Sequence, residues 1–185
     1  MVLSGDTTGR LMKYDPRSKE IRVLLNNLSY PNGVSLSKNG DFILISDTTN
    51  CRILKLWLQT SKRGTVEIFT ELPGFPDNIK RNPKGEFWVG FHSRRAKFLK
   101  WIIISYPWIG NSLTFDITKL YSLVANFRGC GLAARLSENG DILEMLEDNS
   151  GSKWKFISEV EERNGKLYIG SVKMPFVGIQ KMSSA

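Results

Sequence analysis

The sequence is poor in cysteine, and the few cysteines that it has exclude two classes of protein. Cys51 and Cys130 are the two cysteines, and they have neither the CxxC spacing of a metal site nor the density of a disulfide scaffold. A cysteine-ligated metal module and a disulfide-stabilised mini-domain are therefore excluded. The two cysteines can pair with each other or stay free.

Long apolar runs are also missing from the sequence. The amino terminus has no basic segment followed by an apolar run, so no signal peptide is visible. The longest apolar stretch lies near residues 98–110, where Lys100 and Pro107 interrupt it, and it is too short to span a bilayer. We therefore expect no membrane-spanning segment.

The basic residues form no continuous run, although they outnumber the acidic ones. The net charge is +8, from 26 Lys and Arg against 18 Asp and Glu, but the basic residues are scattered, for example as Lys62-Arg63 and Lys80-Arg81. This pattern is typical of a solvated basic surface, so we expect no nucleic-acid partner. The 41% hydrophobic content is sufficient for one globular core, which excludes a disordered chain and predicts a single region over residues 1–185.

Short runs rich in branched and aromatic residues, separated by Gly, Asn and Pro turns, are the dominant pattern. Runs of this length and composition predict β-strands. The chain is therefore predicted to be all-β. The predicted strands cover residues 10–15, 21–25, 41–46, 52–58, 65–70, 86–91, 141–146, 154–162, 166–172 and 176–182.

An internal repeat organises these strands. Residues 31–45 and 76–90 align so that the turn glycines Gly40 and Gly85 fall 45 residues apart, and a third copy places Gly165 another 80 residues on. An apolar strand, a Gly turn and a second apolar strand, recurring about every 40 to 50 residues, are typical of propeller blades. The alternative is a set of unrelated hairpins that share ordinary turn chemistry.

The irregular third interval predicts an insertion at residues 93–128, where the strand and turn rhythm is lost and a helix-like patch occurs. This insertion can act as a lid over a propeller face, contact a membrane surface through its aromatic residues, or plug a blade edge. About three to four blades can be counted, whereas a closed propeller has at least about four. We therefore expect the chain to be part of a longer protein, with open sheet edges that favour self-association.

The sequence contains six long motifs: SGDTTGRLMKYDP, LSYPNGVSLSKNGDFILISDTT, CRILKLWL, LPGFPDNIKRNPKGEFWVG, FISEVEERNGKLYIGSV and MPFVGI. These motifs resemble the strictosidine synthase-like proteins of plants and their animal relative, adipocyte plasma membrane-associated protein. The resemblance covers essentially the whole chain and implies the carboxy-terminal half of a six-bladed β-propeller. Calcium-dependent lactonases and arylesterases are related to this family.

The resemblance also implies a metal site. In the related lactonases a calcium ion lies in the central channel, held by carboxylate and Asn side chains at the starts of the innermost strands. By motif, Asn32, Asp77 and Asn78 match those ligands, and such an ion can polarise an ester or lactone carbonyl. The function implied is hydrolysis of a small-molecule ester or lactone. The alternative is that these residues only cap turns through bonds to backbone amides.

A second activity implied by the resemblance is the Pictet-Spengler condensation of strictosidine synthases, which uses a Glu as acid and base. Counting back from KLYIG without gaps, that position is Lys155, and a lysine cannot replace the carboxylate, so alkaloid synthesis is disfavoured. Glu159, Glu161 and Glu162 lie nearby and are expected to be strand-surface acids. A third possibility is a non-catalytic propeller that binds a small molecule or a protein on one face.

Two further residues are candidates for a functional role. His92, the only histidine, follows the FWVG strand and is a candidate general base, or else a residue of the surface or lid. Asn27 begins the glycosylation acceptor sequence Asn-Leu-Ser. The resemblance implies the secretory pathway, in the vacuole or endoplasmic reticulum, where such a site can be used.

Overall fold

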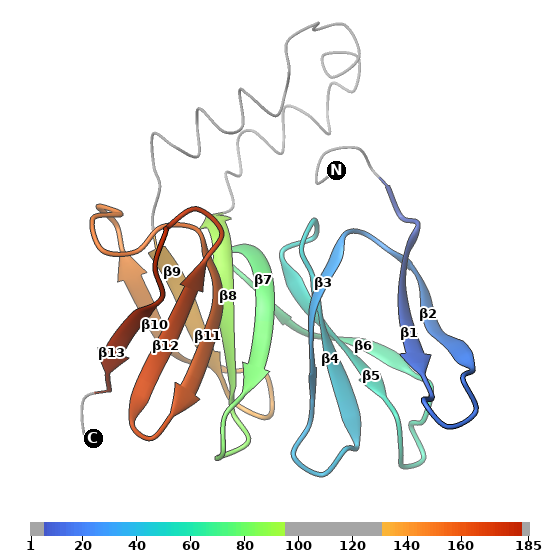
Figure 1. The fold of residues 1–185 in the computed structure, drawn as a ribbon. Coiled ribbons are helices and arrows are strands. Elements are labelled where there is room, and N and C mark those ends of the chain that lie inside the picture. Colours follow the sequence, from blue (N-terminus) through green and yellow to red (C-terminus); the bar gives the residue numbers. More distant parts are fainter. Residues whose placement is uncertain (1–5, 95–130, 183–185) are drawn as a thin grey trace, which may run out of the picture.

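The computed structural model describes residues 6–94 and 131–182, and this part of the chain contains thirteen β-strands and no helix (Figure 1). The first sheet pairs β1 (Gly9–Tyr14) with β2 (Ile21–Leu28). The second contains, in order, β3 (Pro31–Leu36), β4 (Phe42–Asp47), β5 (Arg52–Trp57) and β6 (Val66–Glu71). The third contains β7 (Gly74–Arg81), β8 (Phe87–Arg94), β9 (Gly131–Leu136) and β10 (Ile142–Asp148). The fourth contains β11 (Ile157–Arg163), β12 (Lys166–Ser171) and β13 (Gly178–Lys181).

Each sheet is an antiparallel meander of consecutive strands, as blades of a propeller are. The turn glycines of the repeat close the first hairpins of the second, third and fourth sheets. Gly40, Gly85 and Gly165 have φ angles of 76°, 99° and 69°, which glycine adopts without the steric cost that a side chain brings. The all-β prediction and the repeat of hairpins are thus confirmed.

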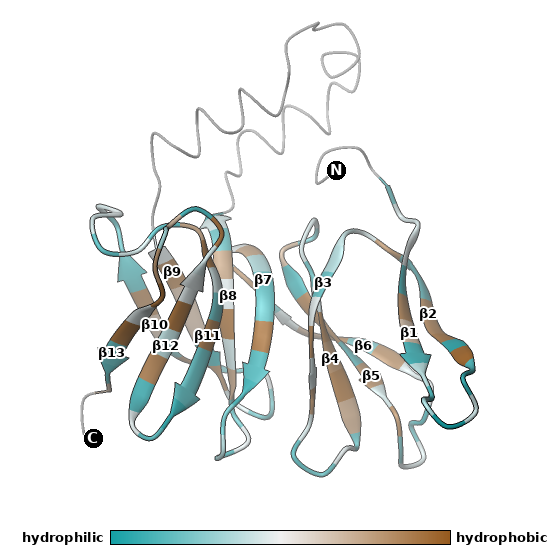
Figure 2. Ribbon diagram, viewed as in Figure 1, coloured by the Kyte–Doolittle hydropathy of each residue, from teal (hydrophilic) through white to brown (hydrophobic). Residues whose placement is uncertain are grey.

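The sheets stack face to face, and the core lies between them. Strand β8 shows the arrangement best, because its alternate residues face opposite neighbours. Phe87, Val89 and Phe91 pack with Leu44 and other apolar side chains of the second sheet. Trp88 packs instead with the buried residues of the fourth sheet. In Figure 2 the apolar colour accordingly runs through the strands, whereas the lower hairpin turns are hydrophilic.

A polar contact also connects the third and fourth sheets. The Glu162 carboxylate on β11 accepts hydrogen bonds from Asn82 Nδ2 at 2.8 Å and from Trp88 Nε1 at 2.9 Å. Asn82 is 2% exposed and Trp88 is fully buried, so Glu162 satisfies donors that water does not reach. The expectation that Glu162 is a strand-surface acid is therefore wrong, because it lies between two sheets.

The first strands of the second, third and fourth sheets lie side by side. Strand β7 contacts both β3 and β11, so these three strands form a continuous inner wall. The approach is close at Gly33, where an added Cβ would come within 2.5 Å of Asn78 Cα. A side chain at that position would push β3 and β7 apart, so glycine sets the spacing of the wall.

The predicted insertion at 93–128 begins in the last two residues of β8, and its remainder lies outside the described residues. It falls between two strands of one sheet, since β8 pairs directly with β9. Within the described ranges, no helix has the length and apolar character needed to cross a membrane.

Candidate functional site

The inner strands lose their regular pairing near their starts. The register shifts between Pro31 and Val34 on β3 and between Pro76 and Ile79 on β7. A bulge of this kind bends a strand and changes the direction of its side chains, and bulges are frequent beside active sites. The three candidate metal ligands, Asn32, Asp77 and Asn78, fall within these two irregular segments.

The structure brings two of the candidate ligands together. The Asn32 side chain lies near the Asp77 carboxylate, across the contact between β3 and β7, and acts on its pKa. Asn78 belongs to the same place, because its Cα lies against Gly33, the neighbour of Asn32. Asn32 and Asp77 are 45 positions apart and hold equivalent places in the repeat.

Asp77 is in an environment that disfavours its charged form. Burial raises the pKa of the Asp77 carboxyl above its usual range, the Asn32 side chain partly opposes this, and the negative charge of Glu159 raises the pKa further. Nearby carboxylates of this kind repel each other until a cation is placed close to them. A cation placed nearby would therefore stabilise the charged form of the Asp77 carboxylate.

Glu159 enters the site from the third inner strand. Its Oε1 lies 3.4 Å from Lys80 Nζ, so an ion pair connects β11 to β7 three residues beyond Asp77. Glu159 is a strand-surface acid as expected, with a side chain that is 35% exposed, and it also pairs with Lys80 of the neighbouring blade. Glu161 is exposed, also as expected.

The donor atoms suit a hard cation. Asn32, Asp77 and Asn78 offer amide and carboxylate oxygens, which Ca²⁺ prefers over nitrogen or sulfur ligands. Across residues 6–94 and 131–182, no group of three or more His, Cys, Asp or Glu side chains is placed to hold a metal. A site here therefore depends on the amides, with Asp77 as its central carboxylate.

His92 lies elsewhere on the same sheet. Its ring centroid is 5.2 Å from that of Phe156, and Lys173 Nζ is 4.2 Å from the same Phe156 ring. Burial, and then the positive charge of Lys173, lower the pKa of the His92 imidazole. The contacts described for His92 are thus with the segments flanking the fourth sheet, and the imidazole is neutral at neutral pH.

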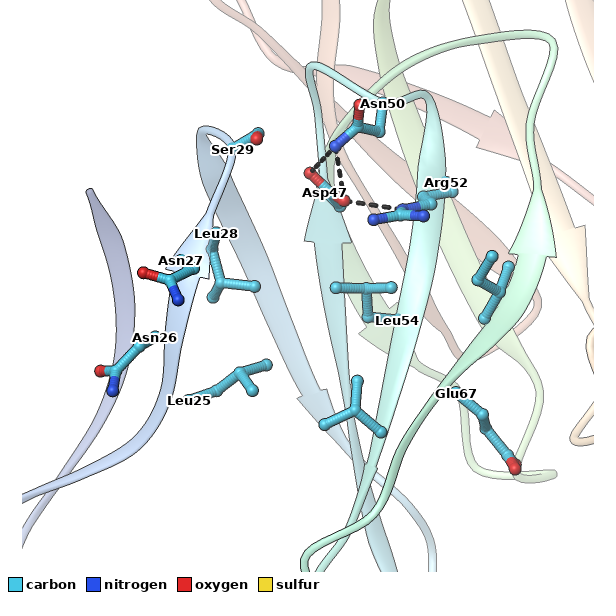
Figure 3. A pocket seen from close by; sticks show the side chains of 12 residues that line it. Leu25, Asn26, Asn27, Leu28, Ser29, Asp47, Asn50, Arg52, Leu54 and Glu67 are labelled. Atoms are coloured by element: carbon cyan, nitrogen blue, oxygen red, sulfur yellow. Dashed lines mark hydrogen bonds and ion pairs between the residues drawn. The ribbon is translucent and has the colours of Figure 1, made fainter. Parts of the chain in front are cut away.

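A pocket of about 300 Å³ separates β2 from the second sheet (Figure 3). At its upper end Asp47, 1% exposed, accepts hydrogen bonds from Arg52 Nε at 2.7 Å and from Asn50 Nδ2 at 3.0 Å. Leu28 and Leu54 line its apolar part. Asn27, the predicted glycosylation acceptor, belongs to this lining and is exposed, so its side chain is accessible to solvent.

Lys155 lies in the connection between β10 and β11, ahead of the inner strand. Its side chain is exposed, its backbone N–H donates to Met174 Sδ at 3.3 Å, and its carbonyl accepts from Ser171 Oγ. The same connection borders a second pocket of about 450 Å³, whose lining includes Trp154 and Gln180. The lining of this pocket comes from β9 to β13 and contains none of the candidate ligands Asn32, Asp77 and Asn78.

Comparison with known proteins places these features in context. A family model described as strictosidine synthase matches residues 1–61. The strictosidine synthase-like 10 and strictosidine synthase-like 2 proteins of Arabidopsis thaliana are each 48% identical, over 96% and 98% of this chain and 48% and 50% of their own lengths. Human adipocyte plasma membrane-associated protein is 35% identical over 96% of this chain and 43% of its own length. The chain thus spans about half the length of the curated relatives that it matches.

Solved structures with the same architecture are β-propellers. A luciferin-regenerating enzyme superposes with a TM-score of 0.60 at 14% identity, over 91% of this chain and 46% of its own. Regucalcin, a calcium-binding protein from Agrobacterium tumefaciens, gives 0.57 at 14%, over 92% and 47%. A gluconolactonase from Xanthomonas campestris gives 0.55 at 13%, over 86% and 40%. At these identities the likeness establishes the fold, and the four sheets are blades of a partial propeller.

Proposed function

The chain belongs to the strictosidine synthase-like family, and we propose that the complete propeller is a calcium-dependent hydrolase of small esters or lactones. One observation carries the proposal. Asn32 and Asp77, from consecutive blades, meet at the irregular starts of the inner strands, where Asp77 is half-buried and repelled by Glu159. A gluconolactonase and a calcium-binding protein among the structural neighbours are consistent with this chemistry on the same fold.

Each residue of the proposed site has a distinct role. Asp77 supplies the charge, and Asn32 and Asn78 add amide oxygens beside it. A bound calcium ion would polarise the substrate carbonyl and stabilise its developing negative charge. His92, kept neutral by burial and by Lys173, is the candidate base that accepts a proton from water.

The remaining ligands are expected in the part of the relatives that this chain does not span, so we expect the chain by itself to lack activity. Condensation of the strictosidine synthase type stays disfavoured, since Lys155 carries no carboxylate and lies outside the inner strands. We also expect the complete protein to enter the secretory pathway, in the vacuole or endoplasmic reticulum, where Asn27 can receive a glycan.

Calcium binding tests the proposal most directly. Calorimetric titration of the full-length protein with CaCl₂ should show stoichiometric binding that Asp77→Ala abolishes. Asp141→Ala is the matched control, because Asp141 is an exposed aspartate in the β9–β10 turn. Chelation should also abolish the hydrolysis of aryl esters and lactones. Unchanged calcium binding in Asp77→Ala, or hydrolysis that is indifferent to chelation, would contradict the proposal.

A second candidate function is a non-catalytic propeller that binds a small molecule or a protein. The pocket beside Trp154 favours it, because its lining contains none of the candidate ligands Asn32, Asp77 and Asn78. Saturable binding of a ligand that Trp154→Ala weakens, together with no calcium binding and no hydrolysis, would support this alternative.

A further inference from the structure

The inner wall carries one ion pair beside the candidate ligands. Lys80 Nζ on β7 is 3.4 Å from Glu159 Oε1 on β11, with side-chain exposures of 48% and 35%. The pair therefore bridges two blades at the strands that line the wall. It lies close enough to Asp77 for the Glu159 charge to act on that carboxyl.

The backbone on both sides of the pair is fixed. A Cβ added to Gly90 on β8 would come within 3.0 Å of the Glu159 backbone nitrogen, so β11 is packed directly onto the third sheet at this residue. On β7, Lys80 follows the buried Ile79, which pairs with Val89 beyond the register shift. The pair can change by side-chain rotation, whereas the two strands cannot move apart without loss of packing.

The charged side chains beside the candidate ligands carry more negative than positive charge. Asp77 and Glu159 contribute one negative charge each, and Lys80 contributes one positive charge. Glu159 acts on Asp77 even while it is paired with Lys80, and the Lys80 ammonium offsets only part of the attraction that Glu159 has for a cation. If Lys80 were absent, the Glu159 carboxylate would add its full attraction for a cation, and if Glu159 were absent, the Lys80 ammonium would add repulsion.

We propose that the Lys80–Glu159 ion pair sets the affinity of the Asn32, Asp77 and Asn78 site for a divalent cation. Glu159 attracts the cation from a third blade, and Lys80 restrains that attraction by competing for the same carboxylate. The inference rests on the proposed calcium site, because it assigns a tuning role to residues that flank the ligands. It adds Glu159 of β11 to a site whose candidate ligands, predicted from the sequence, all lie on β3 and β7.

Calcium titrations of the full-length protein carrying single and double substitutions test this role. Lys80→Met should tighten the dissociation constant for Ca²⁺ about three- to fivefold, and Glu159→Gln should weaken it by a similar factor, the size typical of partly exposed charges. The double variant should return close to the wild-type value, because the two charges cancel. Lys84→Met, an exposed lysine in the β7–β8 turn, is the matched control and should leave the affinity unchanged.

Two further readouts separate the possible results. Raising the salt concentration should shrink the difference between Lys80→Met and wild type, since mobile ions screen partly exposed charges. Thermal unfolding with a chelator present should confirm that each variant is folded. Wild-type affinity in both single variants, with Asp77→Ala still unable to bind, would overturn this inference and leave the calcium site intact. Absence of calcium binding in the wild type would overturn both.

Discussion

Replacing Glu162 by alanine tests whether the polar contact between the third and fourth sheets stabilises the fold. The Glu162 carboxylate accepts hydrogen bonds from Trp88 Nε1 at 2.9 Å and Asn82 Nδ2 at 2.8 Å. The alanine side chain reaches neither donor. Trp88 is fully buried and Asn82 is 2% exposed, so both donors lose the acceptor that they have in the folded protein.

The expected loss follows from these two donors. A buried donor without an acceptor costs about 1 to 3 kcal/mol, and Asn82 Nδ2 keeps a second acceptor in Glu86 Oε2 at 2.9 Å. The Trp88 indole has no such alternative among its described hydrogen bonds. We therefore expect the free energy of unfolding to fall by about 3 kcal/mol, with Trp88 responsible for the larger part.

Urea denaturation followed by tryptophan fluorescence measures this change. With a slope of about 2 kcal/mol per molar urea, a loss of about 3 kcal/mol lowers the midpoint by about 1.5 M. Glu161→Ala is the matched control, since Glu161 is the neighbouring glutamate on the same strand and is exposed. Equal midpoints for the two variants would refute the argument that Glu162 satisfies buried donors.

Two predictions concern titratable groups. Because burial and Lys173 depress the pKa of His92, the folded state binds this proton less readily than the unfolded state, and stability should decrease as the pH falls below 6.5, the ordinary value. His92→Gln should reduce that decrease in urea midpoints measured between about pH 7.5 and about pH 5.5, and an identical decrease in the variant would contradict the assignment. The pKa of Asp77 is raised, so its contribution to stability is lost as the pH rises above 3.8. Asp77→Asn should therefore raise the melting temperature at neutral pH in the presence of a chelator, whereas a lower melting temperature would show that the charged carboxylate is stabilised by other groups.

Much of the fold follows from local sequence. The ten predicted apolar runs correspond to strands, because alternating and branched residues have few other ways to bury their surface. Three strands, β3, β7 and β9, are absent from that list. PNGVSL and GFPDNIKR contain Pro, Gly, Asn and Asp, which favour turns locally, and they become strands only because neighbouring blades hold them in place.

Part of the candidate site could likewise be predicted from the sequence, and part could not. The choice of Asn32, Asp77 and Asn78 as candidate ligands comes from their matching positions in the repeat and from the family resemblance. Glu159 and Glu162 are missed because their partners, Lys80 and Trp88, lie more than 70 residues away in the sequence. A signal for Glu162 was present, since it falls two residues after the buried Val160 and therefore faces the same side of its strand.

Strand β8 belongs to two cores at once. Phe87, Val89 and Phe91 complete the core on one side, and Trp88 completes the core on the other. Neither core can open without disturbing this strand, so fluctuations in the second and fourth sheets are coupled even though those sheets share no hydrogen-bonded strand pair. The propeller segment therefore resembles one cooperative unit built around β8 more than a row of independent blades. The inner wall that carries Asp77 is held rigid as well, because β7 pairs with β8.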